Sequence, residues 1–405
     1  MDRLAGRDFS MSENGTKPTC RCNRRMSVVD GQSRHAIRAE PLPILTSSGK
    51  HKKKRNCEPE RPTNILPEGL PGPSQRQESD HAMPFSRERS VSRRSFCLCC
   101  VGGALYTATG GWLTPREAFA EARGLVSLIK DSAAVSSMDT HKLRNNVSVL
   151  EGSGGNIAVL TGSDGKVLID AGIGVSRPQI TKALAALGAD PVTHLINTHW
   201  HFDHADGNEW LHSAGAKIIA QQNTRKRLSE VQRVEDWDYN FLPLPSGGIP
   251  SEVFEREHKL KLNGSSIGLK YYGPAHTDSD ISVTFSEANI VHVGDTFWNG
   301  IYPFIDYSTG GSIDGMIAAS DTNLAATTDE TIIIPGHGKP VSNKAELKEF
   351  RDMLVAIRES VAKLKQQGRS RDETVAAKPT AAFDAKWGQF VIDPGFFTRL
   401  VYEGV

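Results

Sequence analysis

The chain has 405 residues, of which 38% are hydrophobic and 23% are charged, so it can bury a sizeable core and is neither fibrous nor wholly disordered. Its formal net charge of +1 hides an uneven distribution along the chain. Residues 1–120 carry 20 basic and 12 acidic side chains, whereas residues 121–405 carry 28 basic and 35 acidic ones. Nucleic-acid-binding domains are typically basic, so the acidic balance of the second region argues against that class of protein.

Residues 1–82 are rich in Arg, Lys, Ser, Pro and Gly and show no sustained apolar periodicity, so we expect a disordered leader. Its basic run at residues 51–55 is typical of solvated charge, with a nucleic-acid patch as the alternative. All six cysteines lie before residue 101. The rest of the chain therefore forms neither disulfides nor thiolate metal sites.

An export signal is predicted within residues 83–120. Arg93 and Arg94 precede an uncharged stretch over residues 95–115, and a small-residue cleavage site, Ala118-Phe119-Ala120, follows. This order is that of a secretory signal peptide. The arginine pair resembles the twin-arginine export signal, which implies the twin-arginine export machinery as a partner and a periplasmic or secreted mature protein.

The position of this signal has two further consequences. Because a leader begins near the start of a protein, Met83 is the expected initiator and residues 1–82 are expected to be upstream sequence wrongly included. The uncharged stretch contains four glycines, so we expect no stable membrane anchor in the mature form. An uncleaved anchor is the alternative.

The remaining sequence predicts a linker over residues 121–144, a catalytic domain over residues 145–345, and a C-terminal helix and tail packed on it over residues 346–405. Short β-rich runs bounded by glycine predict an antiparallel meander at the start of the domain. Helical periodicity then alternates with strands, which favours an α/β fold. The expected strands are 147–150, 157–161, 166–170, 193–197, 217–220, 267–272, 281–285, 290–293 and 331–334, and the expected helices are 179–187, about 205–214 and about 344–365.

The densest chemistry follows the strand predicted at residues 193–197. Three histidines and an aspartate lie within six residues, at His199, His201, Asp203 and His204. Imidazole and carboxylate ligands in this density suit a divalent metal. On an extended segment His199 and His201 point to one side, and the turn into the next helix lets Asp203 and His204 face a neighbouring point.

Three more candidate ligands, His276, Asp295 and His337, each follow a later predicted strand. All seven candidates therefore fall at strand-to-loop junctions, where a site on a sheet edge must be built. The other histidines after residue 120 fit no ligand position and are expected to be structural: His141, His194, His212, His258 and His292.

The motif His199-x-His201-x-Asp203-His204, followed by separate His, Asp and His residues, resembles the signature of the metallo-β-lactamase superfamily. The resemblance covers about residues 145–342. It implies an α/β fold, an αββα sandwich of two mixed β-sheets flanked by helices, with two metals at one edge. It also implies a first metal on His199, His201 and His276, a second on Asp203, His204 and His337, and Asp295 bridging or capping them.

The resemblance further implies a hydrolase with two Zn²⁺ as cofactors, iron or mixed metals being possible. A metal-bridging hydroxide, oriented by Asp203, would cleave an ester, lactone, thioester or amide (β-lactam-like) bond of a small-molecule substrate. Many zinc β-lactamases carry cysteine at the position of Asp295, which disfavours a true β-lactamase. Two alternatives stay open: a non-heme iron enzyme similar to persulfide dioxygenases, and a metal-stabilised binding protein. Retention of both His204 and His337 favours the hydrolase.

Several residues near these ligands are candidates for supporting roles. Asp170 and Asp280 are expected to accept hydrogen bonds from ligand imidazoles and so to fix their tautomers. Aromatic residues around the motif are candidate pocket walls, with a core role as the alternative. These are Trp200, Phe202, Trp298 and, with Asp306, the loop residues Tyr302, Phe304 and Tyr307.

Overall fold

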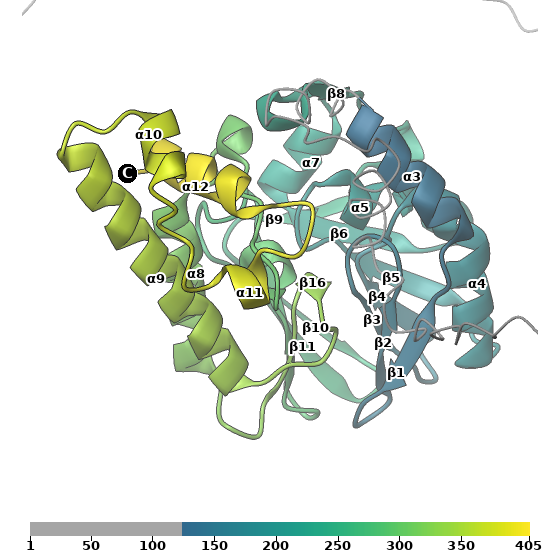
Figure 1. Ribbon diagram of the computed structural model, residues 1–405. Coiled ribbons are helices and arrows are strands. Elements are labelled where there is room, and N and C mark those ends of the chain that lie inside the picture. Colours follow the sequence, from purple (N-terminus) through teal and green to yellow (C-terminus); the bar gives the residue numbers. More distant parts are fainter. Residues whose placement is uncertain (1–123) are drawn as a thin grey trace, which may run out of the picture. The chain divides into compact units, whose positions relative to one another are not determined.

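The computed structural model describes residues 124–405 (Figure 1). The predicted leader, the start at Met83 and the export signal all lie outside the described residues. Among residues 124–405, no helix combines the length and the apolar character that a membrane span requires.

The first sheet has seven strands in the order β1-β2-β3-β4-β5-β6-β9. Strands β1 to β4 are antiparallel, which confirms the predicted meander, and the pairs from β4 onward are parallel. The strands are β1 (Asp139–Lys142), β2 (Val147–Glu151), β3 (Ile157–Leu160), β4 (Lys166–Ile169), β5 (Val192–Ile196), β6 (Lys217–Gln221) and β9 (Glu252–Phe254).

The second sheet has five strands in the order β10-β11-β12-β13-β15, antiparallel up to β13 and parallel between β13 and β15. Two short strand pairs lie outside it: the hairpin β7–β8 and the parallel pair β14–β16. The strands are β7 (Gln232–Val234), β8 (Tyr239–Phe241), β10 (Glu257–Leu262), β11 (Ser265–Tyr271), β12 (Ile281–Phe285), β13 (Ile290–His292), β14 (Trp298–Asn299), β15 (Ile332–Ile334) and β16 (His337–Gly338).

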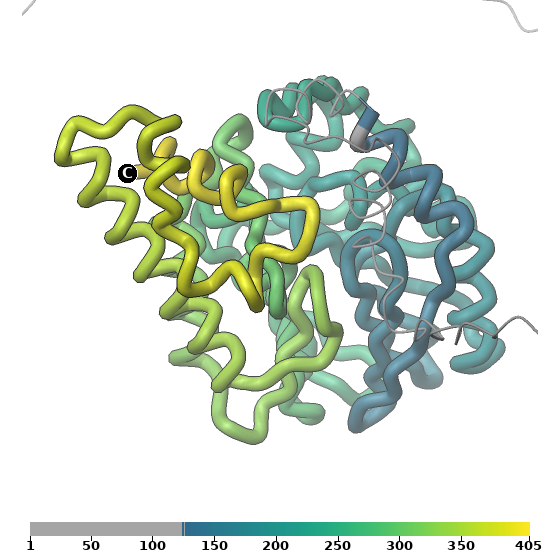
Figure 2. The backbone as a smooth tube through the Cα atoms, viewed as in Figure 1, coloured from purple at the N-terminus to yellow at the C-terminus, as the bar shows by residue number. Residues whose placement is uncertain are grey.

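The two sheets pack face to face and are covered by helices on their outer sides (Figures 1 and 2). Buried side chains of both sheets, such as Val149 and Ile219 of the first and Leu269 and Val283 of the second, form one cluster between them. Helices α4 (Arg177–Ala186) and α6 (Asn208–Ser213) cover the first sheet, and α8 (Ile313–Ala326) and α9 (Lys344–Gln366) lie on the other side. The fold is therefore the predicted αββα sandwich of mixed sheets.

The segment expected to be a linker, residues 121–144, differs from that expectation. It contains helix α3 (Leu125–Val135) and strand β1. Val126, Ile129 and Ala133 are spaced by three and four residues and pack on a cluster that includes Phe202. Because α3 has no side-chain N-cap and a short apolar face, its sequence gives only a weak helix signal.

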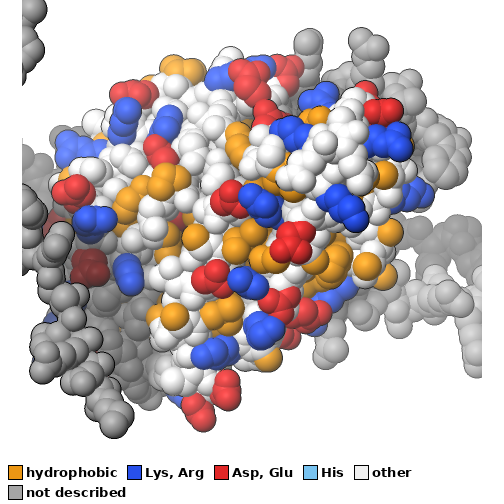
Figure 3. All heavy atoms as spheres, turned by 90° about the vertical axis from the view of Figure 1, so that its left-hand side faces the viewer, with side chains coloured by type: hydrophobic (Ala, Val, Ile, Leu, Met, Phe, Trp, Pro, Cys, Tyr) orange, Lys and Arg blue, Asp and Glu red, His pale blue; other side chains and the backbone are white. Residues whose placement is uncertain are grey.

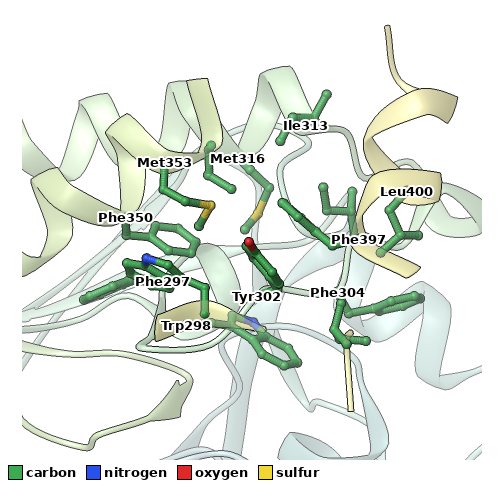
Figure 4. Packing of buried hydrophobic residues seen from close by; sticks show 14 of the residues in the cluster. Phe297, Trp298, Tyr302, Phe304, Ile313, Met316, Phe350, Met353, Phe397 and Leu400 are labelled. Carbon is green, nitrogen blue, oxygen red and sulfur yellow. The ribbon is translucent and has the colours of Figure 1, made fainter. Parts of the chain in front are cut away.

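The C-terminal region contains α9, close to its predicted bounds, and three shorter helices: α10 (Arg371–Ala376), α11 (Asp384–Trp387) and α12 (Pro394–Glu403). They enclose an aromatic core in which Tyr302 lies between Phe397 and the methionines of α8 and α9 (Figure 4). The Tyr302 ring stacks on Phe397 at 4.6 Å, and its hydroxyl donates to Asp384. Of the two roles that the sequence left open for Tyr302, pocket wall or core, the structure shows the core.

The outer surface that Figure 3 shows carries Lys and Arg interspersed with Asp and Glu. Several of these charges on α8 and α9 are paired, as in Arg351 with Asp321 and Arg358 with Asp314. On this face, charges of both signs are interspersed.

Candidate metal centre

The central segment of the candidate site joins β5 to the short helix α5 (Phe202–Ala205). Asp170, directly after β4, fixes this segment: its carboxylate accepts from the backbone N–H and the hydroxyl of Thr198, at 2.7 and 2.8 Å. Asp170 adopts φ +68°, a left-handed conformation that aspartate tolerates better than most residues. This strained position places its carboxylate beside the ligand segment, as expected of a supporting residue.

The structure brings all seven predicted ligands together in two groups. In the first group, His201 Nδ1 lies 2.9 Å from His276 Nε2, which lies 3.3 Å from Asp295 Oδ2. In the second, His337 Nε2 lies 3.1 Å from Asp203 Oδ2 and 3.2 Å from His204 Nε2. The first group is His199, His201, His276 and Asp295, and the second is Asp203, His204 and His337.

The two groups meet at Asp295, in the turn after β13. Its Oδ2 lies 3.3 Å from Nε2 of both His276 and His337. Its Oδ1 lies 3.1 Å from His204 Nε2. One buried carboxylate therefore contacts histidines of both groups.

Hydrogen bonds from the outer ring nitrogens orient four of the five imidazoles. Since a carboxylate or a carbonyl can only accept, the ring nitrogen that faces it carries the proton, and the other nitrogen turns a lone pair to the centre. His204 Nδ1 donates to Asp170, His201 Nε2 to Asp306 and His276 Nδ1 to the carbonyl of Phe304, at 2.8 to 3.0 Å. His199 Nδ1 lies 3.0 Å from the Thr198 hydroxyl, whose own proton goes to Asp170.

The arrangement fits divalent metal ions. The Nε2 atom of His199 is fully buried and has no hydrogen-bond partner. The inward-facing nitrogens of His201 and His276 lie only 2.9 Å apart, although two lone pairs repel each other at such a distance. A cation between them would satisfy these buried atoms, and nitrogen and carboxylate oxygen are ligands that zinc and similar ions accept.

The two groups differ in their protonation. Burial lowers the pKa of His199 well below its usual range and that of His276 to about 4, so both rings are neutral at pH 7. Burial also acts to lower the pKa of His337, but the carboxylates of Asp295 and Asp203 outweigh it and raise the pKa to about 9. Burial opposes ionisation of Asp203, yet His204 and His337 lower its pKa to about 2. A metal ion in the second group would therefore replace a proton.

Two glycines are required beside the ligands. A Cβ atom on Gly155 would lie 2.2 Å from the ring of His204, and one on Gly336 would lie 1.9 Å from Asp295 Oδ1. Only glycine allows the backbone to approach these side chains so closely.

Two supporting residues differ from the sequence predictions. Asp280 does not accept from a ligand imidazole; its Oδ2 accepts the backbone N–H of Thr277 at 2.6 Å, because the carboxylate folds back on its own turn. Asp306, expected in a pocket wall, instead holds His201. His292, expected to be structural, donates to the carbonyl of Asn156 and accepts from Gly294 N–H.

The other predicted pocket walls fall in two places. Trp298 packs against His337 with ring centroids 4.2 Å apart and the rings tilted by 41°, and the ring centroid of Phe304 lies 6.1 Å from those of both His201 and His276. Trp200 and Phe202 line a cavity of about 350 Å³ together with Tyr239 and Phe241 of β8. The sequence analysis missed Trp237, whose ring centroid lies 6.2 Å from that of His201.

Curated relatives match part of the chain. A hydroxyacylglutathione hydrolase of Maricaulis maris is 31% identical over 151 residues, which is 36% of this chain and 48% of that protein. A hydroxyacylglutathione hydrolase of Erythrobacter litoralis is 52% identical over 106 residues, 26% of this chain and 34% of that protein. The chain thus spans about half or less of the length of these relatives.

Solved structures and a family model give the broader relationship. A variant of the sec-alkyl sulfatase PisA1 from Pseudomonas sp. aligns with 68% of this chain and 51% of its own, at a TM-score of 0.50 and 16% identity, which shows a common fold. The model of the metallo-beta-lactamase superfamily matches residues 150–353, half of the chain. This match includes all seven candidate ligands, and the chain belongs to the metallo-β-lactamase superfamily.

Proposed function

We propose that the protein is a hydrolase that holds two zinc ions and cleaves an ester, lactone, thioester or amide bond. The observation that carries this proposal is the shared position of Asp295, at 3.3 Å from a histidine of each ligand group. A carboxylate between two sets of inward-facing nitrogens is the arrangement that a pair of metal ions requires. A single ion in the first group would leave His204 and His337 without a metal to bind.

The chain's own residues then divide the work. Bound zinc would supply a Lewis acid that polarises the substrate carbonyl and makes water a nucleophile near neutral pH. Among the second group, the side chains of Asp203 and His337 keep 12% and 7% of their surface exposed, whereas His204 is fully enclosed. Asp203 therefore faces the side from which a substrate and the attacking water arrive. Its carboxylate, held ionised by His204 and His337, would accept a hydrogen bond from that water and so orient it.

A thioester is the substrate class with the most support. The curated relatives are named hydroxyacylglutathione hydrolases, and a hydroxyacylglutathione is a thioester. Many zinc β-lactamases carry a cysteine where this chain has Asp295. Residues 124–405 contain no cysteine that could supply such a thiolate from another position. We accordingly rank the thioester first and the β-lactam last.

Metal analysis and a substrate screen test this function. Protein produced in a native-like host should contain about two zinc equivalents, and His337→Ala should lose one of them while the fold persists. His212→Ala, on the outer helix α6, is the matched control and should keep both. In a screen of thioester, ester, lactone, β-lactam and phosphodiester substrates, the thioester should react fastest. A single tightly bound iron with no zinc would instead favour the persulfide-dioxygenase alternative.

We also propose that the twin-arginine signal exports the protein to the periplasm or beyond. The packed helix α3 begins at Leu125, shortly after the predicted cleavage at Ala120, so cleavage there would remove no described element. Replacing Arg93 and Arg94 together by lysine should leave uncleaved protein in the cytoplasm. Unchanged export of this variant, seen by cell fractionation and mass spectrometry, would refute the proposal.

A further inference from the structure

We propose that three aromatic side chains around the metal centre select substrates whose carbonyl carries an aromatic or bulky apolar group. We call Trp237, Trp298 and Phe390 the aromatic rim; they come from the β7–β8 hairpin, from β14 and from the connection between α11 and α12. This inference rests on the hydrolase function proposed above, and it names the acyl group that the same site prefers.

Two members of the rim flank the ligands directly. The ring of Trp298 lies against His337 at 4.2 Å, and that of Trp237 lies 6.2 Å from His201. Since His337 and His201 belong to different ligand groups, the two indoles lie beside different metal positions. A substrate carbonyl that reaches both metal positions would therefore have indole rings close to its acyl group.

Phe390 connects the two sides of the centre. Its ring lies 6.4 Å from that of Trp298, and it packs both against the C-terminal core and against the cluster of α3, Ile173 and Phe202. Phe202 lies between the ligands His201 and Asp203 in the sequence, so this second contact reaches the ligand segment. Figure 1 shows the connection between α11 and α12 extending from the C-terminal helices toward α5.

The connection is anchored at its ends and less tightly held in the middle. The carbonyl of Trp387 accepts the backbone N–H of Tyr302, and Ile392 is buried. Between them, Gln389 is exposed and Phe390 is only partly buried. Phe390 is thus the aromatic residue of this connection that offers apolar surface to a bound group.

Two observations favour an apolar acyl group over a charged one. Two cations that line one cavity with Trp200 and Phe202 are paired, Lys130 with Asp206 at 3.2 Å and Arg227 with Asp278 at 2.7 Å. The superfamily model matches residues up to 353, so Phe390 lies in a C-terminal region that this model does not cover. Aromatic side chains bind planar apolar groups well.

Two thioesters of one common thiol, acetyl and phenylacetyl, test the rim. Wild-type kcat/KM should be about 10-fold or more higher for the phenylacetyl thioester, since small differences in apolar contact change this ratio by about 10- to 200-fold. Phe390→Ala should bring the ratio close to one, and Phe390→Leu should restore part of it. Phe383→Ala, at the start of α11 and packed on the same C-terminal core, is the matched control and should keep the ratio.

A binding measurement separates failure of the rim from failure of the hydrolase function. Calorimetry on the metal-loaded protein should show that phenylacetate binds more tightly than acetate, and that Phe390→Ala removes the difference. If neither thioester is hydrolysed but this binding difference holds, the rim stands and the proposed function fails. If Phe390→Ala lowers kcat/KM equally for both thioesters, or leaves the ratio and the binding difference unchanged, the rim proposal is wrong.

Discussion

The metal centre and the aromatic rim are adjacent, yet different interactions hold them. The candidate ligands are buried apart from a small part of Asp203, and four of the five imidazoles are oriented by a hydrogen bond from the outer nitrogen. The rim is held by ring packing, and the indole nitrogens of Trp237 and Trp298 have no hydrogen-bond partner. Hydrogen bonds fix distance and direction, whereas apolar packing tolerates adjustment.

This difference suggests that the chemical step and the choice of substrate are separable in this protein. Changes in the centre should lower the rate for every acyl group by a similar factor. Changes in the rim should alter the ratio between acyl groups and leave metal binding intact. The predictions below test this separation, and they are ordered from the largest expected effect to the smallest.

Replacing Asp203 should have the largest effect. Asp203→Asn keeps the shape of the side chain but removes the charge that binds the second metal and orients water, so kcat should fall by about 10²-fold or more. Steady-state kinetics should show that kcat falls by the same factor for the acetyl and the phenylacetyl thioester. The melting temperature of the metal-free protein should hardly change, a comparison that avoids the stabilisation by bound metal. Near wild-type turnover would exclude the role assigned to Asp203.

Replacing Asp306 should weaken metal binding without altering substrate preference. Its carboxylate accepts the His201 Nε2 proton at 3.0 Å, and the loss of such a partner typically weakens metal binding by about 10- to 100-fold. Competition with a chelator should detect this loss for Asp306→Asn, while the ratio of kcat/KM between the two thioesters stays constant. A changed ratio with unchanged metal affinity would assign Asp306 to the rim instead.

Replacing Asp236, the residue before Trp237, should have the smallest effect, a change in stability that depends on pH. Burial raises the pKa of Asp236 to about 6, Glu403 and Asp306 add to this, and Arg399 and Arg371 oppose it. The pKa of Asp236 is higher in the folded protein than in the unfolded chain, so protonated Asp236 contributes favourably to the free energy of unfolding. This contribution is complete below about pH 4 and is lost as the pH rises through about 6.

At pH 7 the folded protein therefore holds an unfavourable buried charge, which Asp236→Asn removes. The variant should be more stable by about 1 kcal/mol, or about 2 to 4 °C in Tm, at pH 7. Thermal melts at pH 4 should show no such gain. An equal gain at both pH values would trace the effect to packing rather than to charge.

The sequence was sufficient to predict which seven His and Asp side chains come together, because they lie at strand ends that the fold brings to one edge. His199 to His204 are contiguous, and His276, Asp295 and His337 each follow a strand with a clear apolar pattern. Asp170 was predictable for the same reason, as it directly follows β4. The alternation of strands and helices favoured an α/β fold, and the αββα sandwich was implied by the resemblance of the His-x-His-x-Asp-His motif to the metallo-β-lactamase superfamily.

The rest depends on contacts between distant segments. Asp306 lies 105 residues from His201 in the sequence, and the hydroxyl and backbone N–H of Thr309 hold its carboxylate in place. The β7–β8 hairpin, with three residues in each strand, is too short for a clear periodic pattern, so the position of Trp237 was not predicted. Tyr302 shows the same limit, since an aromatic residue in a loop fits either a pocket or a core until its packing partners are known.

Anomalous diffraction at the zinc absorption edge, on crystals of natively matured protein, tests the central claim most directly. The account predicts two anomalous peaks about 3.5 to 4 Å apart. One should be bound by His199, His201 and His276 and the other by Asp203, His204 and His337, with Asp295 in contact with both. A single peak at the first group, with His204 and His337 bonded only to their neighbours, would contradict the dinuclear centre.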